Sequence, residues 1–113
     1  MPDSVHAHLT TKAWPRLQLL GEDERVVDGI RAKWVGTHHR SSMAFVIDTK
    51  AGRVALTDCV FKYPNLEQRR PLGIQESMEE CLRAYDWLRR EADIVVPLYD
   101  PEIFTRHKDG KIE

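Results

Sequence analysis

The sequence lacks the features that mark several large classes of protein. It has only two cysteines, Cys59 and Cys81, and both lie within apolar stretches. We therefore expect two reduced, buried thiols rather than a disulfide framework. The longest apolar runs, residues 43–47 and 94–97, are far shorter than the roughly 20 residues of a membrane span. The first residues show no basic stretch followed by an apolar one, so no secretory signal is expected. These absences favour a cytoplasmic protein.

The sequence also lacks a net charge of either sign. Its 17 basic and 18 acidic residues leave a formal charge of -1, so no electrostatic footprint for nucleic acid or for an anionic membrane is present. The hydrophobic fraction of 42% and the charged fraction of 31% are ordinary for a folded soluble chain. A length of 113 residues fits one domain. We expect a single domain over residues 14–113, preceded by a loose, polar segment over residues 1–13.

The apolar pattern predicts several strands. Residues 21–24 indicate a turn, and residues 30–35 then alternate between apolar and charged side chains, as a half-buried strand does. Residues 43–47 are apolar on both faces, which is typical of a central strand. A turn containing Gly52 and a returning strand over residues 54–57 complete a hairpin. Residues 94–97 indicate a last, short buried strand.

One strong helix is predicted over residues 77–92. Ser77 and Glu80 match a capping box, in which each side chain bonds the backbone of the other residue. Apolar residues then recur at three- and four-residue spacing, giving the helix one apolar face. Pro64, Pro71 and Gly73 predict an irregular connection before the helix, and residues 102–107 a final helical turn. The fold class is therefore α+β, with one mostly antiparallel sheet and one main helix on one face.

Polar residues that can carry chemistry follow the predicted strands. Loops at strand ends on one edge of a sheet are where such proteins build their sites. Imidazole and carboxylate groups there suit zinc or iron. The aspartates among them also have a structural interpretation. An aspartate can equally cap a turn or orient a neighbouring side chain such as a histidine. The candidates are His38, His39, Arg40, Asp58, Tyr99 and Asp100.

Several segments resemble the C-terminal half of metallo-β-lactamase-fold hydrolases, in the lactonase-like branch. They are residues 36–49, residues 56–58 with 65–67, and residues 96–101. The resemblance implies half of an αββα sandwich. It also implies that His38 and Asp58 are ligands of a metal, zinc or alternatively iron or manganese. His39, Arg40 and Asp100 would then contact the substrate or support the ligands from a second layer.

The sequence departs from that family at two places. The family's His-x-His-x-Asp-His motif belongs to the N-terminal half, and residues 6–8 reproduce only its first two histidines. Tyr99 stands where the family has a further histidine ligand. A tyrosine can polarise a carbonyl oxygen, but its ordinary pKa near 10 makes it a poor zinc ligand at neutral pH. Two remaining ligands do not form a tight site, so the isolated chain is expected to hold metal weakly or not at all.

The resemblance leads to alternative functions. A half-domain exposes an apolar sheet face, so we expect either a homodimer or a complementary N-terminal half as partner. The first hypothesis is a fragment of a metal-dependent hydrolase that cleaves a small ester, lactone or amide with metal-activated water and is incomplete alone. The alternative is a non-catalytic homodimeric binding module, a pseudoenzyme of the same fold. A third is cofactor-free chemistry with His38 or His39 as general base.

Overall fold

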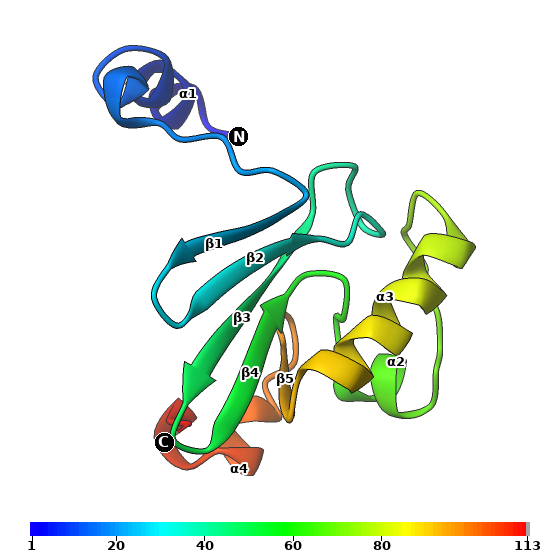
Figure 1. Cartoon of the computed structure of the whole chain (residues 1–113). Coiled ribbons are helices and arrows are strands. Elements are labelled where there is room, and N and C mark those ends of the chain that lie inside the picture. Colours follow the sequence, from blue (N-terminus) through cyan, green and yellow to red (C-terminus); the bar gives the residue numbers. More distant parts are fainter. Residues whose placement is uncertain (113) are drawn as a thin grey trace.

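The computed structural model describes residues 1–112 and contains one five-stranded sheet (Figure 1). The strands follow one another in sheet order β1 to β5. Strands β1 to β4 are antiparallel neighbours, and β5 pairs in parallel with β4. The elements in chain order are α1 (Asp3–Thr10), η1 (Trp14–Arg16), β1 (Asp23–Val27), β2 (Ile30–Trp34), β3 (Met43–Thr49), β4 (Gly52–Thr57), α2 (Tyr63–Glu67), α3 (Met78–Glu91), β5 (Ile94–Pro97), α4 (Ile103–Arg106) and η2 (Lys108–Gly110).

The core lies between α3 and one face of the sheet. The predicted helix is confirmed, with Ser77 as its N-cap: the Ser77 hydroxyl accepts a hydrogen bond from the Glu80 N–H at 3.3 Å. The apolar side of α3 is buried through Cys81, Ala84, Tyr85 and Leu88. These side chains pack in one cluster with small residues of the central strands, Ala44, Val46 and Ala55. Small residues on the sheet let the helix approach it closely.

The opposite face of the sheet is apolar but less completely buried. Register pairs Ile30 with Ile47 and Phe45 with Leu56, and directly opposed residues of antiparallel strands share a face. All four side chains keep part of their surface exposed, whereas Ala44, in the same sheet, is fully buried. The prediction of α+β architecture, with one mostly antiparallel sheet and one main helix on one face, is confirmed.

Two helices replace segments that the sequence had indicated as irregular. Residues 3–10 form α1, which buries none of its residues and lies away from the sheet (Figure 1). The prediction of a loose segment did not include this helix, because the helix lacks an apolar face and so gives no periodic signal.

Tyr63–Glu67 forms α2 despite Pro64, which occupies a first-turn position where its missing N–H costs nothing. The Asn65 side chain accepts from the Lys62 N–H at 2.9 Å and closes this short turn.

Strand β1 was also missed, because residues 21–24 had been assigned to a turn. Asp23 and Glu24 instead pair with Lys33 and Ala32 of β2. The strand lies at the edge of the sheet and is mostly exposed, so it shows no alternation of apolar and polar residues. The remaining predicted strands and the final helical turn near residues 103–106 are confirmed.

The expectations about cysteines and membrane spans can be compared directly with the fold. Cys59 and Cys81 are both free and fully buried. Burial raises the pKa of the Cys59 thiol to about 12, so this thiol stays protonated and unreactive. Across residues 1–112, the helices are all too short or too polar to cross a lipid bilayer.

Candidate site at one edge of the sheet

The three candidate segments meet at the same edge of the sheet, the one formed by the ends of the strands rather than by an outer strand. The loop of residues 35–42 joins the end of β2 to the start of β3, Asp58 directly follows β4, and Tyr99 follows β5. Register aligns these ends, because Trp34 pairs with Met43, Ala44 with Thr57 and Thr57 with Pro97. Because β2–β3 and β3–β4 pair antiparallel and β4–β5 pair in parallel, these strand ends lie together. The sheet thus brings together residues that are about 60 positions apart in the sequence.

His38 and Tyr99 are linked through an aromatic residue that the sequence interpretation did not select. The His38 ring lies edge-to-face on Phe61, with ring centroids 4.8 Å apart, and Phe61 lies edge-to-face on Tyr99 at 4.9 Å. His39 stacks at a tilt on His38 at 4.1 Å. Nδ1 of His38 lies 3.4 Å from the carbonyl oxygen of Ile74. The contact with Ile74 favours the tautomer that carries its proton on Nδ1 and leaves Nε2 free.

Asp58 forms a second cluster with Ser42. The Ser42 hydroxyl donates to Oδ2 of Asp58 at 3.0 Å and accepts from the His39 N–H at 3.1 Å. Oδ1 of Asp58 is buried and has no hydrogen-bond partner among residues 1–112. A buried carboxylate oxygen without a donor is costly. The arrangement therefore suits a cation or a hydrogen-bond donor supplied from outside these residues.

The chain's own residues do not fit a complete metal centre. In the part of the chain that the structure describes, no three or more His, Cys, Asp or Glu side chains lie close enough together to hold a metal ion. A catalytic zinc site has three protein ligands, and a structural one has four. His38 and Asp58 can therefore contribute to a metal site only if further ligands come from outside residues 1–112.

Asp100 is engaged by backbone groups rather than by the other site residues. Its carboxylate accepts from the Tyr63 N–H at 2.9 Å and from the Glu102 N–H at 3.0 Å. These hydrogen bonds, that from Tyr63 above all, hold the pKa of Asp100 below its ordinary value. Asp100 thus connects the end of β5 to the start of α2. Its predicted effect on Tyr99 or His38 remains a prediction.

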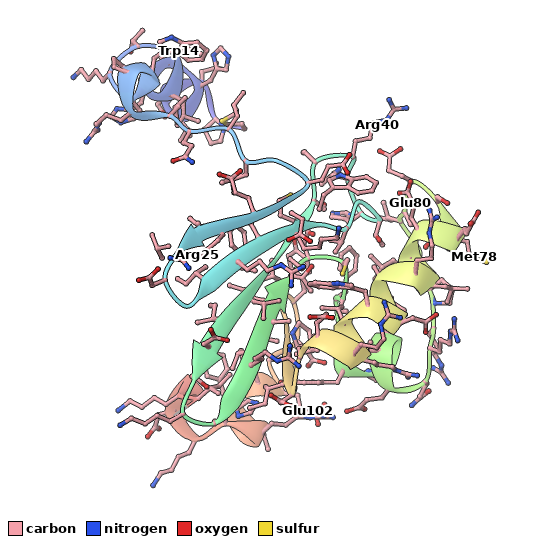
Figure 2. The ribbon with its side chains drawn as sticks, in the orientation of Figure 1. Trp14, Arg25, Arg40, Met78, Glu80 and Glu102 are labelled. Carbon is pink, nitrogen blue, oxygen red and sulfur yellow. The ribbon has the colours of Figure 1, made fainter. Side chains whose placement is uncertain are left out.

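The other candidates are exposed. The Arg40 side chain is 93% exposed, points away from the sheet (Figure 2) and lies 3.9 Å from the Glu76 carboxylate. Its backbone is held more firmly, because its carbonyl accepts from the indole N–H of Trp34 at 2.5 Å. Tyr99 is 55% exposed. Tyr99 and Arg40 therefore remain free to contact a molecule that binds at this edge, and a substrate role for His39 or Arg40 stays a prediction.

An apolar cavity of about 340 Å³ opens beside Asp58. It lies at the site end of the partly exposed sheet face. Its lining combines three polar residues, Asp58 among them, with apolar side chains of β3, β4 and the segment after β5. These residues are Ser41, Met43, Phe45, Leu56, Thr57, Asp58 and Leu98.

The predicted fold, part of a metallo-β-lactamase-type sandwich, is confirmed by comparison with solved structures. Neither a protein-family model nor a curated protein matches the chain by sequence. Solved structures do match it. One is an N-acyl homoserine lactone hydrolase with the product N-hexanoyl-L-homoserine bound at its catalytic metal centre (TM-score 0.68, 22% identity, 80% of this chain and 38% of that one). Another is a quorum-quenching N-acyl homoserine lactone lactonase (TM-score 0.67, 21% identity, 84% of this chain and 40% of that one).

A third similar structure is a mutant of the B. thuringiensis AiiA enzyme with N-decanoyl-L-homoserine bound at the active site (TM-score 0.68, 22% identity, 80% of this chain and 38% of that one). At such identities the likeness establishes the fold alone. The chain spans only 38% to 40% of the length of these neighbours. The catalytic metal centre of the first and the molecules bound to the first and the third belong to those longer proteins.

Proposed function

We propose that the chain is one part of a metal-dependent hydrolase that acts on a small ester, lactone or amide. The remaining metal ligands would come from outside residues 1–112. One observation carries the proposal. The edge of the sheet gathers His38, Tyr99 and Asp58, and Oδ1 of Asp58 is buried there without a hydrogen-bond partner among the described residues. The fold shared with lactone hydrolases supports the class of reaction.

Each site residue has a defined contribution in this proposal. Ser42 fixes the orientation of Asp58 by donating to Oδ2, so that Oδ1 stays available. Ile74 accepts from Nδ1 of His38, so that Nε2 is available as a ligand. Tyr99 is largely exposed, and its hydroxyl can donate a hydrogen bond to the carbonyl oxygen of a substrate. The apolar cavity next to Asp58 would then receive an apolar part of that substrate.

The partner is part of the proposal as well. The partly exposed sheet face, with Ile30, Phe45, Ile47 and Leu56, would be covered by a complementary half or by a second copy of the chain. Either would bury apolar surface that a lone chain leaves in water. The alternative function, a homodimeric binding module without catalysis, is favoured by one observation: residues 1–112 contain no cluster of three metal-ligating side chains.

Zinc binding by the purified chain separates these functions. We expect weak binding that His38→Ala and Asp58→Asn each reduce by about tenfold or more, because each removes a ligand. His8→Ala serves as the matched control, since His8 lies on α1 and away from the sheet edge (Figure 1). Isothermal titration with zinc gives the affinities. Equal affinity in all four proteins would contradict the hydrolase proposal, and a dimer indifferent to zinc is the result expected of a binding module.

A further inference from the structure

The loop that presents His38 has an unusual backbone. Gly36 and Thr37 both adopt left-handed conformations, with φ of 57° and 73°. A positive φ is uncommon for any residue other than glycine and is a genuine outlier for a β-branched one such as threonine. Such a conformation persists only where the surrounding structure imposes it. Because Thr37 directly precedes His38, whatever imposes its conformation also places the histidine.

The start of α3 and the segment before it supply that constraint. The Thr37 carbonyl accepts from the Glu76 N–H at 2.7 Å. The Thr37 N–H donates to Oε2 of Glu80 at 3.5 Å, and the Thr37 side chain is fully buried. Both backbone polar groups of Thr37 thus bond residues that lie about 40 positions later in the chain.

Glu80 does not close the capping box that its spacing with Ser77 predicts. The Ser77 hydroxyl accepts from the Glu80 N–H, but the Glu80 carboxylate extends to the loop instead. A Cβ added at Gly36 would lie 2.8 Å from Oε2 of Glu80 and 2.9 Å from the Trp34 ring. The positive φ of residue 36 and the close approach of the Trp34 ring both favour glycine there. Figure 2 shows Glu80 on the side of α3 toward this loop and Met78 on the outer side.

We infer that Glu80 is a positioning residue, whose carboxylate holds the loop of residues 36–42 so that His38 is presented at the sheet edge. The inference rests on the proposed function only in treating His38 as a metal ligand. The geometry of the loop can be measured whether or not the protein is a hydrolase. Failure of zinc binding and failure of the positioning role are therefore separate results.

The test compares three variants of the full chain by NMR. Glu80→Ala removes the acceptor, and Glu80→Gln keeps an acceptor oxygen. Glu79→Ala is the matched control, because the Glu79 side chain is exposed and forms an ion pair with its helix neighbour Arg83. The ring resonances of His38 are recorded at one and the same pH for all four proteins, the wild type included. They sense the nearby rings of Phe61 and His39.

We expect Glu80→Ala to shift the His38 ring resonances and to speed amide exchange of Thr37 by about tenfold, since a buried N–H loses its acceptor. Glu80→Gln should restore both readouts, and Glu79→Ala should leave both unchanged. A general loss of stability would not discriminate between alanine and glutamine in this way. The inference is overturned if Glu80→Ala matches Glu79→Ala, or if Glu80→Gln perturbs His38 as much as Glu80→Ala does.

Discussion

Leu88→Ala is expected to lower the free energy of unfolding by about 2–5 kcal/mol. Leu88 is fully buried on the inner side of α3, within the cluster that joins this helix to the sheet. Removing three carbon atoms there leaves a cavity that the small neighbours Ala44 and Ala55 cannot fill. Domains are stable by only about 5–15 kcal/mol in total, so the loss would be a large share of the whole. Urea unfolding followed by circular dichroism measures it.

Met78→Ala is the matched control for that experiment. Met78 begins the same helix but is 60% exposed, so its side chain is largely in water before and after the change. We expect the free energy of unfolding to change by no more than about 0.5 kcal/mol. Equal losses in Leu88→Ala and Met78→Ala would show that α3 does not pack on the sheet as described.

Asp100→Ala is expected to destabilise the fold by about 1–3 kcal/mol at neutral pH. The change leaves the buried Tyr63 N–H without its acceptor and removes the acceptor of the Glu102 N–H. The connection between β5 and α2 is then weakened. Thermal unfolding compares the variant with Asp48→Ala, which alters an exposed aspartate of β3 and should leave the melting temperature close to that of the wild type.

The loss in Asp100→Ala should depend on pH. The folded protein holds the pKa of Asp100 below the ordinary value of 3.8, chiefly through the hydrogen bond from the Tyr63 N–H. A carboxyl group with a lowered pKa contributes its full stabilisation above that ordinary value and loses it as the pH falls through the lower, folded-state pKa. The stability difference between wild type and Asp100→Ala should therefore shrink in acid. A difference that stays constant from neutral pH into strong acid would contradict this assignment.

The sequence predicted the parts of the fold that have a regular apolar pattern. Helix α3 and the hairpin of β3 and β4 could be located because one face of each is buried, and burial produces periodicity. Helix α1 and strand β1 could not, since both are mostly exposed and the local sequence carries no such pattern. Helix α2 was missed because Pro64 ends a helix in most positions but is accepted in the first turn.

The candidate site was predictable in position but not in its contacts. Because each follows a predicted strand, His38, Asp58 and Tyr99 were expected at one edge of the sheet. The register of β2 to β5 does bring the ends of these strands together. The role of Phe61, which contacts both His38 and Tyr99, depends on the path of a loop that no local signal determines. The pairing of Ser42 with Asp58 likewise joins residues 16 positions apart and requires the fold to be known.

The outer edge of β1 bears on how this chain avoids aggregation. An open strand edge offers unpaired N–H and C=O groups to any other sheet and so invites fibril-like stacking. Here that edge carries Asp23, Glu24 and Arg25, and the register shifts between Arg25 and Val27. Charges and an irregular backbone both discourage such stacking. Backbone pairing along the outer edge of β1 is thus disfavoured, so copies of this chain would meet through the apolar face of the sheet more readily than through β1.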